Sequence, residues 1–213
     1  MYHFDYVTKA EARPVWEEIH KILLEVQDQV RGQFTFQFRF VGSSSPNINM
    51  ITCDRRSNIG FDFDVNIYVN DEEECFSAED LRRILKRAID RVARRYGYEN
   101  CEDSTRVLTM KMVDRSRRAI HHSCDFAIVW DSEDGQQYVR YNKKANYYSW
   151  EYQGGTFQNL EERMKWLKKN GYWGKLRDYY LEKKNTNQDP NKKSRSIFAE
   201  AVKEMCDKAG YFD

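Results

Sequence analysis

Apolar residues recur at helical spacing in two stretches of the first hundred residues. The first stretch begins near Pro14, whose fixed φ suits a first helical turn, and ends at Gly32. The second follows Ser77, which forms a plausible N-cap arrangement with Asp80 three positions later. Each predicted helix has one apolar face to bury against another element. The apolar positions are Val15, Ile19, Ile22, Leu23, Val26 and Val30 in the first helix, and Leu81, Ile84, Leu85, Ala88, Ile89 and Val92 in the second.

Alternation of apolar and polar residues predicts strands around these helices. In the segment 33–41 phenylalanine occupies every second position from Phe34, and the run 60–69, GFDFDVNIYV, continues the period of two. Further strands are predicted over 105–113 and 122–131, followed by a hairpin-like segment over 136–155.

The remaining segments complete the domain organisation. The stretch 46–60 has no clean period and is expected to be a loop. From residue 157 onward the pattern is helical in short pieces, with a last helix near 195–209. We therefore expect a domain over 1–153, which includes the N-terminal helix, and a helical C-terminal region over 154–213.

The composition indicates a globular protein. The 213-residue chain is 40% hydrophobic and 15% aromatic, which is enough to form a core despite 32% charged residues. Its 35 lysines and arginines nearly balance 34 acidic residues, which argues against a protein held to nucleic acid mainly by its overall field. A local basic face is still open, because the second predicted helix carries one that either binds phosphates or is simply solvated. Its basic residues are Arg82, Arg83, Lys86, Arg87, Arg91, Arg94 and Arg95.

The chain shows no pattern of export, membrane insertion or metal-binding cysteines. Charges interrupt the segment 1–14 where a signal peptide would be apolar, and no run approaches the roughly 18 apolar residues of a membrane span. We expect a cytoplasmic protein without a membrane partner. The five cysteines are odd in number and widely spaced, so reduced thiols are expected. His121 and His122 would point to opposite faces of a strand, which is poor geometry for one metal.

Two aspartates interrupt the apolar strand 60–69. Alternate side chains of a strand share a face, so Asp62 and Asp64 project together from the side opposite the apolar residues. Nearby carboxylates raise each other's pKa unless a cation relieves them, and Mg²⁺ prefers such oxygen ligands. Asp125, a lone acid in another apolar run, is the third candidate ligand of a two-metal site, whose ions about 4 Å apart would clamp the oxygens of phosphoryl transfer. Acids that simply face solvent at strand ends are the alternative interpretation.

A glycine–serine turn precedes the strand that carries the aspartates. Gly42 is followed by Ser43 and Ser44 in the motif VGSSS. Backbone N–H groups of such a turn can cradle phosphate oxygens, because glycine allows close approach and serine adds a hydroxyl donor. A turn that only connects two elements is the alternative. Because the VGSSS turn precedes the strand with the candidate metal ligands, a single site that binds both phosphate and metal is favoured.

The motifs VGSSS and DFDVNIYV and the isolated Asp125 resemble the signature of the polymerase-beta-like nucleotidyltransferase superfamily: hydrophobic-Gly-Ser, Asp-x-Asp and a third Asp. The resemblance covers roughly residues 33–131 and assigns no subfamily. It implies an α+β fold with a small mixed β-sheet and helices on one side. It also implies that the helical region 154–213 closes over the site.

The resemblance implies a role for each motif. Gly42 and either Ser43 or Ser44 would hold the triphosphate of a nucleoside triphosphate (NTP). Two ions, Mg²⁺ or Mn²⁺, would bind the three aspartates, and the last aspartate would also help to activate an acceptor hydroxyl. The implied metal ligands and catalytic residues are Asp62, Asp64 and Asp125.

We therefore expect an enzyme that moves a nucleoside monophosphate from an NTP to an acceptor hydroxyl and releases pyrophosphate. In-line attack on the α-phosphorus would depend on positioning and electrostatics. The acceptor is a small molecule, a protein side chain or an RNA end. One alternative is a catalytically silent nucleotide-binding or regulatory module that acts on a protein partner. Another is hydrolysis of a phosphate ester, which would need no acceptor and release no pyrophosphate.

Overall fold

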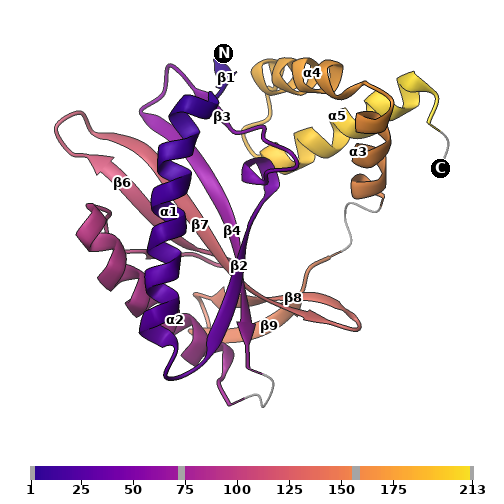
Figure 1. The fold of residues 1–213 in the computed structure, drawn as a ribbon. Helices are drawn as coiled ribbons and strands as arrows, with labels where there is room; N and C mark the ends of the chain where they lie inside the picture. Colours follow the sequence, from indigo (N-terminus) through magenta and orange to yellow (C-terminus); the bar gives the residue numbers. More distant parts are fainter. Residues whose placement is uncertain (1–2, 72–74, 155–158, 212–213) are drawn as a thin grey trace. The chain divides into compact units, whose positions relative to one another are not determined.

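The computed structural model divides into two compact units, which are described separately (Figure 1). The described residues are 3–71, 75–154 and 159–211. The sheet unit comprises residues 7–51 and 57–153. The helical unit comprises the described parts of 1–6, 52–56 and 154–213. Among the described residues, no helix is both long and apolar enough to cross a membrane.

The first helix of the sheet unit, α1 (Lys9–Val30), begins earlier than the sequence predicts. The reason is a capping box, in which Thr8 Oγ1 accepts from the Glu11 N–H while the Glu11 carboxylate accepts from the Thr8 N–H. Pro14 therefore lies inside the helix and not at its first turn. The capping pair places one apolar stripe of α1 over the sheet.

The second helix, α2 (Ala78–Ala93), begins where its capping residue predicts. The Ser77 side chain accepts a hydrogen bond from the Asp80 N–H at 3.1 Å. The helix continues into a short 3-10 helix, η2 (Arg94–Tyr96), which ends at Gly97 with φ of 88°. The left-handed conformation of Gly97 turns the chain back toward the sheet.

The sheet is mixed, and its spatial order is β2, β4, β7, β6, β5. β4 and β7 are parallel, the other neighbours are antiparallel, and the β8–β9 hairpin joins through β7. The strand bounds are β2 (Thr35–Val41), β4 (Ile59–Asn70), β5 (Glu102–Asp103), β6 (Leu108–Asp114), β7 (Ala119–Ser132), β8 (Gly135–Asn142) and β9 (Tyr147–Tyr152). The predicted α+β fold with a mixed sheet is confirmed. The strand expected from residue 105 begins later, at Leu108, because Ser104 and Val107 close a turn before it.

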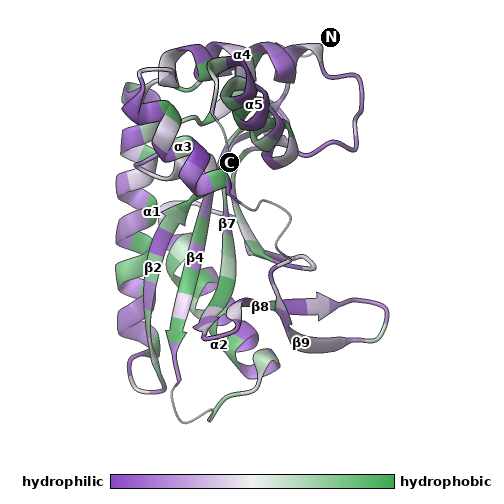
Figure 2. Cartoon of the chain, turned by 90° about the vertical axis from the view of Figure 1, so that its right-hand side faces the viewer, coloured by the Kyte–Doolittle hydropathy of each residue, from purple (hydrophilic) through white to green (hydrophobic). Residues whose placement is uncertain are grey.

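One hydrophobic core joins the sheet to α1 and α2. On β4, Phe63, Val65 and Ile67 are at most 1% exposed and share a buried cluster with Leu23 of α1 and Leu85 of α2. In Figure 2 polar colours interrupt the apolar stretches of β2 and β4, as their period of two requires. The strands are therefore apolar toward the helices and polar on the other face.

The helical unit combines the two short strands with the C-terminal helices. β1 (Phe4–Tyr6) pairs with β3 (Thr52–Asp54), which lies inside the predicted loop 46–60. Lys184 is 6% exposed, donates to Thr52 Oγ1 at 2.7 Å and lies 4.0 Å from the Phe4 ring centroid. The sequence predicts neither of these strands. The helices are α3 (Leu160–Lys169), α4 (Trp173–Thr186) and α5 (Ser194–Ala209).

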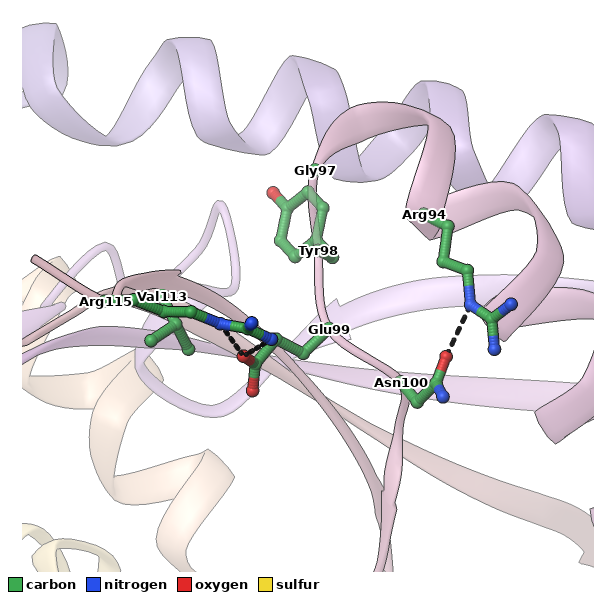
Figure 3. Close-up of a pocket in the computed structure, with 7 residues that line it drawn as sticks. All are labelled: Arg94, Gly97, Tyr98, Glu99, Asn100, Val113 and Arg115. Carbon is green, nitrogen blue, oxygen red and sulfur yellow. Dashed lines mark hydrogen bonds and ion pairs between the residues drawn. The ribbon is translucent and has the colours of Figure 1, made fainter. Parts of the chain in front are cut away.

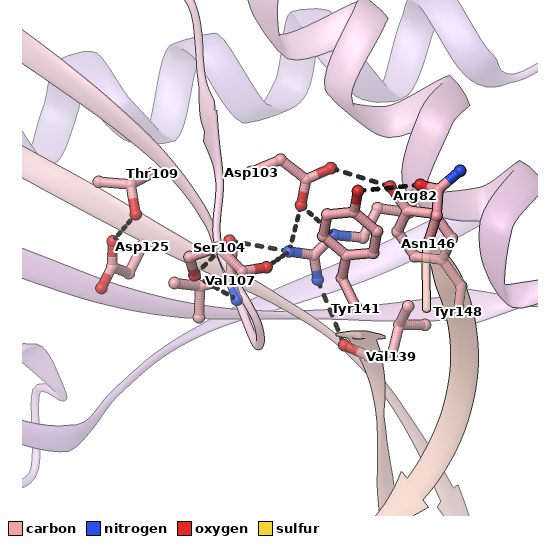
Figure 4. A network of polar contacts seen from close by, with 10 residues as sticks. All are labelled: Arg82, Asp103, Ser104, Val107, Thr109, Asp125, Val139, Tyr141, Asn146 and Tyr148. Atoms are coloured by element: carbon pink, nitrogen blue, oxygen red, sulfur yellow. Dashed lines mark hydrogen bonds and ion pairs between the residues drawn. The ribbon is translucent and has the colours of Figure 1, made fainter. Parts of the chain in front are cut away.

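One residue of the predicted basic face of α2, Arg82, is buried and faces neither solvent nor a ligand. Its side chain is only 1% exposed and ion-paired with Asp103 at 2.7 Å. It also donates to the backbone carbonyls of Ser104, Val107 and Val139 (Figure 4). The guanidinium thus satisfies polar groups at the end of the sheet that no apolar side chain could satisfy.

We expect Asp103→Ala to lower the free energy of unfolding by about 3 kcal/mol, because it leaves the buried guanidinium of Arg82 without its counter-charge. Urea denaturation measures the change. Glu17→Ala is the matched control: it removes the exposed pair with Arg13 and should lower the free energy of unfolding by less than about 1 kcal/mol. Equal losses in the two variants would show that Arg82 does not depend on Asp103.

Candidate active site

The parallel pairing of β4 and β7 brings the three candidate aspartates onto one face of the sheet. Asp64 is the register partner of Asp125, and Asp62 is the partner of Ser123. Partners on neighbouring strands lie about 4.8 Å apart and point to the same side. Cys124, which precedes Asp125, is completely buried on the opposite side. Asp125 thus lies on the strand next to the one that carries Asp62 and Asp64.

The carboxylates are close enough to influence each other's ionisation. Burial raises the pKa of Asp125, and the negative charge of Asp62 raises it further. Burial likewise raises the pKa of the Cys124 thiol, and all three aspartates add to that effect from across the strand. These shifts show that negative charge is concentrated at one point of the sheet.

Two residues of β6 act against this concentration of charge. Thr109 Oγ1 donates a hydrogen bond to Asp125 Oδ1 at 2.5 Å (Figure 4), and the positive charge of Lys111 also lowers the pKa of Asp125. Thr109 is the register partner of Asp125, and Lys111 is the partner of Ser123. Our motif-based prediction did not include Thr109 or Lys111. The alternation in TRVLTMKMV was the available signal, because it places both on the polar face.

The glycine of the Gly–Ser turn lies directly against Asp64. Gly42 begins the 3-10 helix η1 (Gly42–Ser44) that follows β2, and its φ is 59°. A Cβ at this position would lie 2.8 Å from Asp64 Oδ2. Only glycine therefore combines this left-handed backbone with so close an approach to the carboxylate.

The two serines of the turn have different environments. Ser44 is 7% exposed, and its hydroxyl donates to the Val41 carbonyl at 2.7 Å and accepts from the Asp64 N–H at 3.1 Å. Ser43 is half-buried, and its carbonyl accepts from the Met50 N–H at 2.9 Å. Within the described part of the chain, the Ser43 hydroxyl makes no hydrogen bond. Ser44 therefore ties the turn to β4, which leaves Ser43 as the serine that can meet a ligand.

The donor set at this point of the sheet suits a hard divalent cation. Carboxylate oxygens are the ligands that Mg²⁺ prefers, and a cation would relieve the mutual repulsion of the aspartates. Across residues 3–71, 75–154 and 159–211, however, no three His, Cys, Asp or Glu side chains converge closely enough to form a ready-made metal site. The residues thus fit the chemistry of the ion without being fully gathered around one point.

The sequence matches no protein-family model and no curated protein, whereas the fold matches solved structures of DncV. The GTP-bound form of Vibrio cholerae DncV has a TM-score of 0.57 at 14% identity, over 93% of this chain and 52% of that chain. The V. cholerae enzyme, described as a cyclic AMP-GMP synthase, in complex with nonhydrolyzable GTP has a TM-score of 0.58 at 15% identity, with 93% and 53% covered. Escherichia coli DncV in its 3'-deoxy GTP bound form has a TM-score of 0.56 at 14% identity, with 94% and 54% covered.

These likenesses establish the fold. The fold that the motifs predict is confirmed, because the chain shares it with the DncV structures. The chain spans about half the length of the DncV structures it matches. The low identity leaves the subfamily unassigned.

The raised pKa of Asp125 makes a prediction about stability. Because the fold raises this pKa above the unfolded value of about 3.9, the ionised carboxylate destabilises the protein once the pH exceeds that value. Asp125→Asn should therefore raise the melting temperature at pH 7.5, and the gain should vanish below about pH 4, where both states are protonated. The exposed Asp28, paired with Arg31, gives the control variant Asp28→Asn, which should show no gain. A lower melting temperature for Asp125→Asn at pH 7.5 would show that the ionised carboxylate of Asp125 does not destabilise the fold.

Proposed function

We propose that the chain is a metal-dependent nucleotidyltransferase that moves a nucleoside monophosphate from an NTP to an acceptor hydroxyl. The observation that carries the proposal is the register of Asp64 with Asp125 beside the close approach of Gly42 to Asp64. A Gly–Ser turn, whose backbone N–H groups can bind an anion, thus lies next to a cluster of carboxylates. Its support from the comparisons is the shared fold with DncV structures that contain GTP or a GTP analogue.

The proposed metal ligands are Asp62, Asp64 and Asp125. When bound, Mg²⁺ or Mn²⁺ ions would offset the repulsion between these carboxylates and the phosphates and would stabilise the attacking and leaving oxygens. The chain itself fixes the positions of the carboxylates, because the apolar side chains on the opposite face of β4 and β7 are buried in the hydrophobic core. The Thr109 hydroxyl keeps one oxygen of Asp125 in a fixed direction.

The Gly–Ser turn and Asp125 have separate roles in the proposed reaction: the turn binds phosphate and Asp125 accepts a proton. The backbone of Gly42 and the hydroxyl of Ser43 bind phosphate oxygens of the NTP. The acceptor oxygen attacks the α-phosphorus, the bond from that phosphorus to the bridging oxygen breaks, and pyrophosphate leaves with the electron pair. Asp125 accepts the proton of the acceptor hydroxyl.

The acceptor and the final domain arrangement stay predictions. A small molecule, a protein side chain and an RNA end are all compatible with an open sheet face. The helical region 154–213 is expected to cover the nucleotide. The competing function is a silent nucleotide-binding or regulatory module of the same fold, for which the low identity to DncV leaves room.

Calorimetric titration with a non-hydrolysable α,β NTP analogue tests the site, followed by pyrophosphate release from ATP and GTP. We expect Mg²⁺-dependent binding that Asp62→Asn/Asp64→Asn weakens at least about 100-fold, or 2.8 kcal/mol. The control Asp28→Asn/Asp131→Asn makes the same charge change at exposed positions and should bind normally. Binding without pyrophosphate release in the presence of candidate acceptors would favour the silent module. Equal binding by both variants would remove the aspartates from the site.

The two serines allow a sharper test. Ser43→Ala should weaken binding of the NTP analogue about tenfold, the loss of one hydrogen bond to a charged group, and leave stability unchanged. Ser44→Ala should lower the free energy of unfolding by about 1–3 kcal/mol, because the Asp64 N–H loses its partner. Urea denaturation and calorimetry of both variants separate the two effects. Reversed effects would assign the phosphate to Ser44.

A further inference from the structure

The outer face of α2 carries a row of arginines that the proposed reaction does not use. Arg87, Arg91 and Arg94 follow each other at intervals of four and three residues and are all exposed. At about 1.5 Å per residue and 100° per step, they form a row about 10 Å long on one side of the helix. We call these three residues the arginine row.

The arginine row is poorly neutralised. Its flanking neighbours have carboxylate partners, because Arg83 pairs with Asp80 and Arg95 pairs with Glu25. In the part of the chain that the structure describes, no carboxylate lies within 4.0 Å of the guanidinium of Arg87, Arg91 or Arg94. The row is therefore a line of like charges whose repulsion an external anion would relieve.

A cavity of about 350 Å³ extends the row at its C-terminal end. Arg94 on one side and Arg115 on the other contribute to its lining, together with Tyr98. Figure 3 shows Arg94 directed to Asn100 and Arg115 directed to Glu99, on either side of Tyr98. Arg115 belongs to the turn between β6 and β7 and is ion-paired with Glu99 at 3.0 Å, so the unpaired positive charge ends at Arg94.

The chemistry of this surface favours phosphates over a protein partner. Guanidinium groups bind phosphate oxygens in pairs of parallel hydrogen bonds. Protein interfaces usually have an apolar or aromatic centre. Among the described residues, the exposed large hydrophobic side chains are those of Leu24, Ile59, Tyr147 and Tyr152, and none of them belongs to α2. A linear row of cations without an apolar centre suits a linear array of phosphates.

We propose that the arginine row binds the sugar-phosphate backbone of a nucleic acid. The contact uses charge and not base edges, so it depends little on sequence. The site lies on the helix-covered side of the sheet, away from the aspartates, and is independent of the proposed transfer reaction.

Fluorescence anisotropy with labelled 20-base-pair DNA and RNA duplexes and a 20-nucleotide single strand tests the proposal on the full chain. With about three phosphate contacts, the affinity should fall about 40-fold between 50 and 200 mM KCl. Arg87→Gln/Arg91→Gln should weaken binding at least tenfold at 100 mM KCl and reduce the slope of log K against log salt by about 2. The tightest of the three probes identifies the kind of nucleic acid.

Two controls separate this site from other effects. Arg13→Gln/Arg31→Gln makes the same charge change on the exposed side of α1 and should weaken binding by less than threefold. Asp62→Asn/Asp64→Asn should bind nucleic acid at least as well as the wild type, so a failed transferase assay leaves this test intact. No binding, a salt-independent affinity, equal losses in the Arg87/Arg91 and Arg13/Arg31 variants, or equally tight binding of polyglutamate would overturn the proposal. Circular dichroism confirms that each variant is folded.

Discussion

The parallel pairing of β4 with β7 is the constraint on which the rest of the structure depends. A parallel neighbour cannot follow through a tight turn, so the chain must first build α2 and the antiparallel strands that return it. Side chains alternate with a period of two, so a slip by one residue would bury Asp125 and expose Cys124. Because Phe63 and Phe126 are buried in the core, that slip would have to unpack the sheet from its helices. The packing behind the sheet thus fixes the place of the carboxylates in front of it.

The same register concentrates charge that the fold itself does not fully neutralise. Burial and the neighbouring Asp62 raise the pKa of Asp125, while the hydroxyl of Thr109 and the charge of Lys111 only partly oppose them. The backbone of Gly42 is so close to Asp64 that a Cβ at this position would lie 2.8 Å from Asp64 Oδ2. Sites that bind cations and anions commonly retain such unfavourable arrangements until the ligand arrives. The cation and phosphate of the proposed reaction would relieve this arrangement.

The sequence predicted those features that depend on the periodicity of neighbouring residues, namely helices, strands and the faces that their side chains share. The alternation in GFDFDVNIYV placed Asp62 and Asp64 on one face, and the apolar stripe after Ser77 located α2, because burial of one face enforces each period. The sequence could not reveal that Arg82 is buried, since its partners lie far along the chain and meet it only in the folded sheet. The strand Thr52–Asp54 was missed for a similar reason: it is short, and its partner precedes it by about fifty residues. Ser44 and Ser43 were indistinguishable until the turn showed which hydroxyl points into the backbone of β4.

The near-zero net charge of the chain conceals two opposite surfaces. The formal charge of +1 sums the carboxylates on one face of the sheet with arginines on the outside of α2, whose inner side packs on the other face. Salt screens charges beyond about 10 Å at 0.1 M, so each surface has little influence on the other. Arginines beside the carboxylates would have neutralised the aspartates. Their separation by the thickness of the sheet and helix layers lets one small unit present both an acidic and a basic surface, and total charge alone is therefore a poor guide to what such a unit binds.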